Sequence, residues 1–203
     1  MGWNQEHCLS TVYEPLLGPN PDNCMKYDAD TIQQITSRAF SQMNAMIYLA
    51  NHRDNTTPGD PKVGGHPASC SSCMELMTAV HLIVREPQDY VCCKPHASPT
   101  DHALHHLMGL NRHPDGRWFD DSESEAVMHR LRDFSHDGKA VFQSYHAEAD
   151  PDHFHFLPSG SVGIPPVMAA YLSLAHRYAQ SHGWEVPDPH FWCMMGDSEF
   201  REG

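Results

Sequence analysis

Two histidines lie in loops of small and proline residues, where an imidazole can reach a ligand. His66 is part of Gly64-Gly65-His66-Pro67-Ala68-Ser69, and His96 is part of Lys94-Pro95-His96-Ala97-Ser98-Pro99. A neutral imidazole in such a loop can donate a hydrogen bond to a developing oxyanion or relay a proton. We therefore treat both as candidate catalytic residues. Because the chain has 17 histidines, a histidine that only caps a turn is the alternative for each.

Two further loops carry groups suited to an anion and to a cation. Ser159-Gly160-Ser161-Val162-Gly163 precedes a long apolar stretch, and its small residues would let a ligand approach the backbone N–H groups. Asp197 follows an apolar run and is a hard oxygen donor of the kind that holds Mg²⁺ while phosphate groups supply other ligands. An aspartate after a strand is about as often a helix cap or a turn former.

The cysteines offer a second class of chemistry. Cys70 and Cys73 have the spacing of a redox pair, and together with Cys92, Cys93 and a histidine they would make a zinc site. Neither pattern has the flanking sequence expected of such sites. Three histidines share one helical face, where we expect a solvated surface rather than a metal chelate: His102, His105 and His106. A non-catalytic metal- or thiol-binding module is therefore an alternative function.

Periodic apolar residues predict the elements that must position these loops. Steps of three and four predict helices over about 30–49, 73–84, 100–108 and 166–180, and a short helix near 123–134. Asp28 or Asp30 is suited to cap the first of them. Apolar runs predict buried strands at 89–93 and 190–195, the second of them central in its sheet. Strands that alternate with helices predict an α/β fold with an open, mostly parallel sheet and helices on both faces.

The order of the loop motifs resembles that of the thiamine-diphosphate-dependent enzymes of the transketolase superfamily. Within them it is most similar to the bacterial homodimeric pyruvate dehydrogenases. The matching points are Gly-Gly-His-x-Ala-Ser at 64–69, His-x-Ser-Pro at 96–99, Ser-x-Gly at 161–163 and Gly-Asp-x-Glu at 196–199. The resemblance covers about residues 35–203, and the Glu202-Gly203 ending is similar to transketolase itself.

The resemblance implies a thiamine-diphosphate-binding fold over residues 31–203, after an irregular segment 1–30. It implies that Asp197 binds the Mg²⁺ that bridges the two phosphates of the cofactor, and that His66 and His96 line the active site. The cofactor-binding residues that it implies are Ser69, Ser161, Val162, Gly163, Gly196, Asp197, Ser198 and Glu199. The implied activity is decarboxylation of pyruvate or another 2-oxo acid, with transfer of the acyl group to a lipoyl carrier. Transketolase-type ketol transfer is the alternative within the superfamily.

The sequence also departs from this family. Ser198 stands where the family has the second glycine of Gly-Asp-Gly, and the chain stops six residues after Asp197, before the asparagine that completes the metal site. The pyrimidine-binding and C-terminal domains are missing as well. We therefore expect a fold that is incomplete at its C-terminus and a chain that is inactive alone. The expected partners are the remaining domains, supplied by another chain or lost, a second copy of this chain, and a lipoyl acyltransferase.

Composition argues against two classes of partner. Lys and Arg total 13 against 26 Asp and Glu, and the formal net charge of −13 disfavours nucleic acids and anionic membrane surfaces. No apolar run approaches the roughly 20 residues that span a bilayer. The first residues lack the features of a signal peptide, and the seven cysteines do not form a secreted disulfide pattern. We therefore expect a soluble, cytoplasmic protein.

Overall fold

The computed structural model describes residues 27–54, 66–133, 137–152 and 160–201. In these residues the α-helices are α2 (Ala29–Asn51), α3 (Pro67–Ser71), α4 (Met74–Ala79), α5 (Ser98–Leu107), α6 (Asp121–Met128) and α7 (Ile164–Ser181). The other helical turns are the π turn η1 (Val80–Val84) and the 3-10 turns η2 (Pro95–Ala97) and η4 (Glu199–Arg201). The strands are β1 (Tyr90–Cys93) and β2 (Phe191–Met194).

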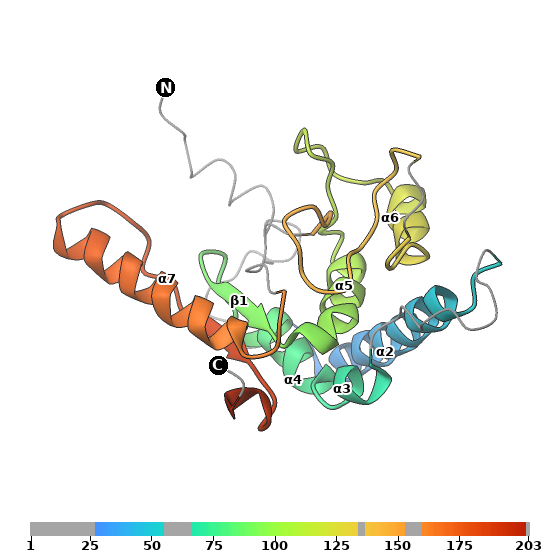
Figure 1. Ribbon diagram of the computed structural model, residues 1–203, viewed down its shortest axis with the longest axis horizontal. Coiled ribbons are helices and arrows are strands. Elements are labelled where there is room, and N and C mark those ends of the chain that lie inside the picture. The colour runs from blue at the N-terminus through green and yellow to red at the C-terminus, as the bar shows by residue number, and fades with distance from the viewer. Residues whose placement is uncertain (1–26, 55–65, 134–136, 153–159, 202–203) are drawn as a thin grey trace.

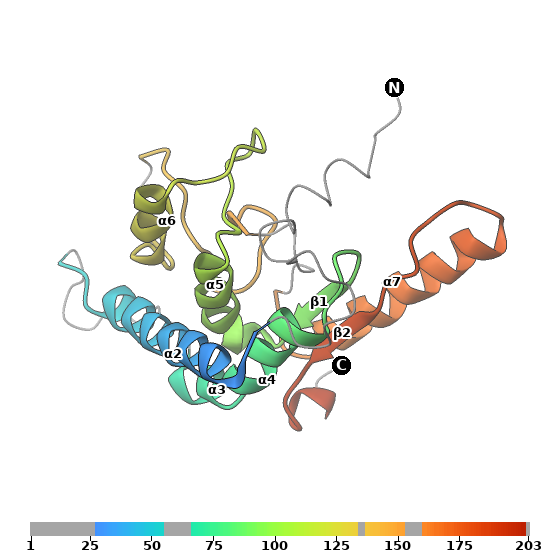
Figure 2. The same ribbon diagram turned by 180° about the vertical axis from the view of Figure 1, so that it is seen from behind.

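The two strands form a parallel sheet in which Cys93 lies opposite Met194. Helix α7 packs against both strands, and α2 and α5 lie on the other side of the molecule (Figure 1, Figure 2). Because the strands end in register, the segments that follow Cys93 and Met194 leave the sheet at the same edge. The predicted parallel pairing of the two strands is confirmed. A larger open sheet stays a prediction.

The predicted burial of the second strand is wrong in part. The side chains of β2 are half-buried, whereas those of β1 are mostly buried. In the described part of the chain β2 pairs with β1 alone, so its central position in a sheet is not shown.

The hydrophobic core lies where α2, α4 and α5 meet. Met43 and Met46 of α2 pack with Met74 and Met77 of α4, and all four are at most 1% exposed. Methionine is unbranched and flexible, so it fills the irregular space between short helices. These four methionines are therefore core residues.

Local capping explains where the helices begin. Helix α2 begins after Asp28, whose Oδ1 accepts a hydrogen bond from the Thr31 backbone N–H at 2.7 Å, as predicted. The helix predicted over 123–134 begins earlier and ends at Met128, because Asp120 and Glu123 form a capping box that fixes its start. Helix α5 begins at Ser98 rather than 100, with a proline at its first turn. The sequence did not predict α3, and the helix predicted over 73–84 is α4 followed by the π turn.

No helix in the described residues is both long and apolar enough to cross a membrane. Several predicted features lie outside the described residues: most of the irregular segment 1–30, the Gly64-Gly65 pair, Ser159 and the Glu202-Gly203 ending.

Candidate functional site

The two histidines that the sequence singled out lie against each other. The ring centroids of His66 and His96 are 4.4 Å apart and the rings are tilted by 41°. His66 directly precedes α3, and its side chain makes no capping hydrogen bond to that helix. His96 lies in η2, immediately after β1. The fold thus brings together two loops that are 30 residues apart in the sequence.

Three neighbours define the surroundings of His96. The Cys70 thiol donates a hydrogen bond to the His96 carbonyl oxygen over 3.3 Å and holds the loop. The Tyr145 ring stacks on the imidazole at 5.7 Å, with its hydroxyl 3.4 Å from Nε2. Burial and the adjacent His66 ring lower the pKa of His96, and the Glu199 carboxylate opposes this. The imidazole is therefore neutral near pH 7 and able to accept a proton or share one with Tyr145.

The segment after β2 has one exposed carboxylate, that of Asp197, and one buried carboxylate, that of Glu199. Asp197 is exposed, and its Oδ1 accepts a hydrogen bond from the Ser198 N–H at 2.9 Å. Glu199 is buried and turns back, so that its Oε2 accepts from the Gly196 N–H at 2.6 Å. Glu199 therefore shapes the turn. Asp197 is not joined by two other metal-ligating side chains in the described part of the chain, so Mg²⁺ here would need oxygen ligands from phosphate groups or water.

The predicted anion-binding loop forms the start of α7. Gly163 is the N-cap residue with φ +84°, a left-handed conformation that favours glycine, and Ser161 accepts a hydrogen bond from the Ile164 N–H at 3.3 Å. Val162 is half-buried and Ser161 exposed. The first turn of α7 has few N–H groups to offer, because Pro165 and Pro166 have none and the Ile164 N–H is already bonded to Ser161. A phosphate here would have to contact the backbone N–H groups of the loop 161–163. Ser69 has a different environment: it lies in α3, where its carbonyl oxygen accepts from the Ser72 hydroxyl at 2.9 Å.

The cysteine alternatives are not supported. Burial raises the pKa of the Cys70 thiol to about 12, whereas a hydrogen bond with Cys93 lowers the pKa of the Cys73 thiol. Both thiols are buried, however, and a reactive redox pair needs access to solvent. All five cysteines in the described residues are free thiols: Cys70, Cys73, Cys92, Cys93 and Cys193. The one group of three potential metal ligands in the described residues contains no cysteine. The alternative of a zinc site built on cysteines is therefore not supported in this part of the chain.

The prediction of a solvated histidine face on α5 is wrong. The side chains of His102 and His105 are fully buried, and that of His106 is 11% exposed. The ring of Phe142 stacks on His102 at 4.0 Å, and Asp152 lies within hydrogen-bond distance of both buried rings. The segment 142–152 covers this face. Because that contact joins distant parts of the chain, the helical pattern alone could not predict it.

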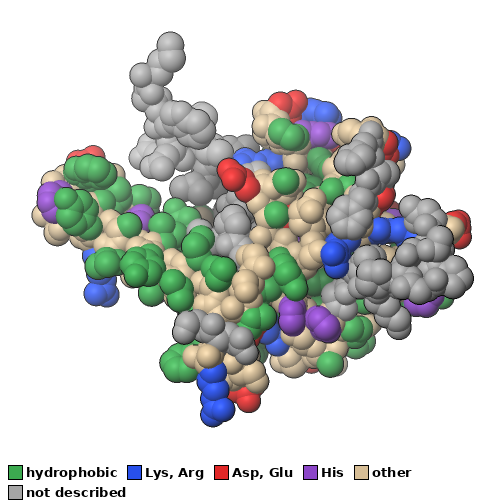
Figure 3. Space-filling view, in the orientation of Figure 1, with side chains coloured by type: hydrophobic (Ala, Val, Ile, Leu, Met, Phe, Trp, Pro, Cys, Tyr) green, Lys and Arg blue, Asp and Glu red, His purple; other side chains and the backbone are tan. Residues whose placement is uncertain are grey.

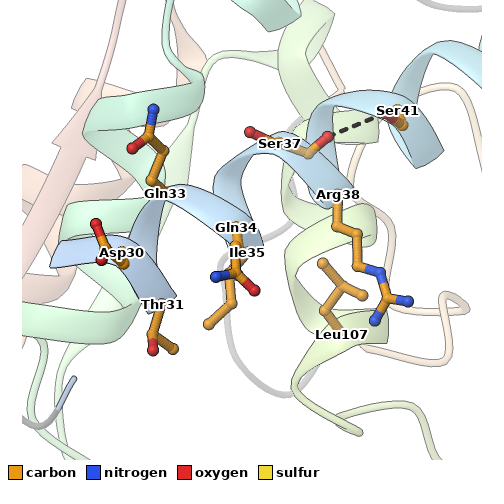
Figure 4. Close-up of a pocket in the computed structure, with 9 residues that line it drawn as sticks. All are labelled: Asp30, Thr31, Gln33, Gln34, Ile35, Ser37, Arg38, Ser41 and Leu107. Carbon is orange, nitrogen blue, oxygen red and sulfur yellow. Dashed lines mark hydrogen bonds between the residues drawn. The ribbon is translucent and has the colours of Figure 1, made fainter. Parts of the chain in front are cut away.

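A separate hollow lies beside α2 and contains none of the predicted site residues (Figure 4). Mostly short or uncharged polar side chains line it: Asp30, Thr31, Gln33, Gln34, Ile35, Ser37, Arg38, Ser41 and Leu107. The candidate site therefore stays at the histidine pair and the edge of the sheet.

The sequence is similar to two curated proteins, each named pyruvate dehydrogenase E1 component. The protein of Pseudomonas aeruginosa is 26% identical over 99% of this chain and 21% of its own length. That of Cupriavidus necator is 26% identical over 81% of this chain and 17% of its own length. The chain thus spans about a fifth of the length of these relatives. No protein-family model matches the sequence, and no solved structure matches it significantly.

Proposed function

We propose that this chain is the Mg²⁺- and diphosphate-binding part of a thiamine-diphosphate-dependent enzyme that decarboxylates a 2-oxo acid, with pyruvate as the first substrate to test. The observation that carries the proposal is the pairing of His66 with His96 beside the sheet edge that the Gly196-Asp197 turn also follows. The similarity to two pyruvate dehydrogenase E1 components supports it.

The residues at this edge suit such a cofactor. Asp197 offers an exposed carboxylate to Mg²⁺, and the Gly196 N–H donates to Glu199 Oε2, which fixes the turn that carries Asp197. The loop at Ser161 to Gly163, just before α7, would offer its backbone N–H groups to a phosphate. When bound, thiamine diphosphate would supply the nucleophilic carbon and the electron sink that decarboxylation needs.

The two histidines have different roles in this proposal. His96 is neutral near pH 7, so it can donate a hydrogen bond to a substrate oxygen or accept a proton. Tyr145, at 3.4 Å from Nε2, is positioned to hold the ring orientation. His66 is exposed at the same place and can contact a substrate carboxylate or carbonyl.

Turnover would require further domains. The curated relatives are about five times longer than this chain. Figure 3 shows hydrophobic side chains gathered along α7, including Tyr171, Leu174 and Tyr178, which are at least 60% exposed. Such a surface would be covered by the remaining domains or by a second copy of the chain. Acyl transfer to a lipoyl acyltransferase belongs to that larger assembly.

Calorimetric titration tests the proposal. The full chain, purified alone and again with the proteins that assemble with it in its own cells, is titrated with thiamine diphosphate in Mg²⁺ and in EDTA. Mg²⁺-dependent binding in the assembly, followed by release of CO₂ from pyruvate, is expected. An assembly that binds no thiamine diphosphate in Mg²⁺ would overturn the proposal. Activity with a ketose phosphate but not with pyruvate would replace decarboxylation by ketol transfer.

A further inference from the structure

A cluster of charged and titratable side chains lies in the core between α5 and the segment that follows α6. Its histidine and aspartate side chains are fully buried: His81, His102, His105, His146, Asp101 and Asp152. Burying so many polar groups is costly unless each finds a partner. The proposed function uses none of them, so the cluster needs an explanation of its own.

The cluster converges on one carboxylate. Nδ1 of His102 and Nδ1 of His105 lie 2.8 Å and 2.9 Å from the same oxygen, Oδ2 of Asp152. The other oxygen, Oδ1, is buried and has no hydrogen-bond partner among the described residues. A buried carboxylate oxygen without a donor is destabilising, because it has lost the water that would hydrate it. A cation beside it would remove that destabilisation.

Asp150 brings a third ligand to the same place. One ligand atom each from His102, Asp150 and Asp152 lies within 4.8 Å of the other two. Asp150 is buried, and its two oxygens accept the backbone N–H groups of Gln143 and Ala147, both at 2.8 Å. Each carboxylate oxygen has a second lone pair, so these hydrogen bonds orient Asp150 without excluding it as a ligand.

We propose that His102, Asp150 and Asp152 bind one divalent transition-metal ion, Zn²⁺ in the first instance, which fastens α5 to the segment 142–152. One imidazole and two carboxylates are ligands that Zn²⁺ accepts, and two carboxylates balance its charge. Two ligands on a tetrahedral Zn²⁺ are roughly 3.3 Å apart, given metal–ligand bonds of 2.0–2.1 Å. The 2.8 Å between Nδ1 of His102 and Oδ2 of Asp152 would therefore open only slightly, and the proton that they share would be released. Asp152 would bind through both oxygens, which uses the unpartnered Oδ1 and makes the ion four-coordinate.

This site differs in chemistry from the Mg²⁺ site proposed at Asp197. Mg²⁺ prefers six oxygen ligands and retains water, whereas this cluster is closed to solvent and contains an imidazole. His105 would orient the Asp152 carboxylate through its hydrogen bond to Oδ2, as hydrogen-bonded neighbours of metal ligands commonly do. The segment that the metal would fasten also carries Tyr145, beside His96. The role inferred is structural: the ion would set the position of that segment.

The test is metal binding by the full chain. Protein freed of metal by dialysis against EDTA is titrated with Zn²⁺ in the presence of a competing chelator, which masks weak binding by surface histidines. One Zn²⁺ per chain and a raised melting temperature are expected. Co²⁺ in place of Zn²⁺ should give visible absorption of a four-coordinate ion without the near-ultraviolet band of a thiolate ligand, which separates this site from the cysteines.

Substitutions of the proposed ligands test where the ion binds. Asp152→Asn and His102→Gln are expected to lower the Zn²⁺ affinity at least tenfold. His129→Gln is the matched control, because His129 is 58% exposed and lies outside the cluster. If the two core variants do not fold, the Zn²⁺ titration and the Co²⁺ spectrum of the wild-type chain test the proposal instead. Wild-type protein that retains no Zn²⁺ against the chelator, a Co²⁺ spectrum with a thiolate band, or an equal loss of affinity in His129→Gln would each overturn the proposal.

Discussion

The Arg85 guanidinium donates a hydrogen bond to Nδ1 of His81, with Nη1 and Nδ1 3.2 Å apart. Because Nδ1 accepts, the ring proton is on Nε2, which donates to Asp101 Oδ1 at 3.0 Å. The buried imidazole is therefore neutral and held in one tautomer between a cation and a carboxylate. Burial lowers the pKa of His81 to about 4; the Asp101 carboxylate opposes this shift, and His105 and Arg85 add to it.

This arrangement predicts acid sensitivity of the fold. In the unfolded chain His81 takes up a proton near pH 6.5, whereas in the folded chain it does so only near pH 4. The free energy of unfolding should therefore fall as pH drops from 6.5 to 4, by up to about 1.4 kcal/mol per pH unit for this group. Above pH 6.5 His81 contributes no pH dependence. Urea unfolding at several pH values measures the slope.

The control for that prediction is substitution by a neutral side chain. His81→Gln can still donate to Asp101 and accept from Arg85, so the slope between pH 6.5 and 4 should flatten without a large loss of stability at pH 7. His129→Gln, on the surface, should leave the slope as it is. Identical slopes for His81→Gln and the wild type would contradict a neutral His81.

Asp197→Ala should remove Mg²⁺-dependent binding of thiamine diphosphate in the assembly. The Asp197 carboxylate is exposed, and Glu199 is engaged by the Gly196 N–H, so no nearby side chain in the described residues is placed to replace it. Calorimetry of the variant with the cofactor and Mg²⁺ measures this. The melting temperature should hardly change, since the exposed side chain makes one hydrogen bond to its neighbour. Unchanged cofactor affinity would remove Asp197 from the site.

His96→Ala should lower turnover of the assembly by roughly 10²- to 10⁴-fold, the usual contribution of a positioned acid or base. Its stability should change little, because the side chain is half-buried and its carbonyl oxygen, which Cys70 contacts, remains. Turnover and thermal unfolding are measured side by side. A large loss of melting temperature with normal turnover would assign His96 a structural role.

Gly163→Ala should destabilise the start of α7. The backbone there has φ +84°, where a Cβ costs roughly 1–2 kcal/mol. Urea unfolding of the variant measures the loss, and Ser161→Ala, at an exposed position two residues earlier, is the control. A variant as stable as the wild type would show that this turn adopts another conformation.

The sequence predicted the elements whose patterns are local. The periodic apolar residues of α2 and α7 and the apolar runs of β1 and β2 needed no knowledge of the rest of the chain. The resemblance implied that His66 and His96 line one site, and the structure places their rings against each other; their catalytic role stays a prediction.

What could not be predicted depends on contacts between distant segments. Tyr145 reaches His96 across 49 positions of sequence, and Asp152 reaches His102 across 50. Residues 109–158 have little periodic apolar patterning, so the sequence did not indicate that part of this segment covers α5. The histidine face of α5 was therefore expected to be solvated. The Asp120–Glu123 capping box was a sequence pattern that could have placed the start of α6 correctly.

The π turn at the end of α4 makes this part of the chain sensitive to its length. Arg85 donates its backbone N–H to the carbonyl of Val80, five residues back, where an α-helix would reach four. The turn therefore accommodates one residue more than an α-helix would. Deleting a residue between 80 and 84 would let ordinary α-helical bonding resume, but it would remove one residue from the connection between α4 and β1. Exchanging Ile83 or Val84, which are 37% and 46% exposed, should be tolerated far better than removing either.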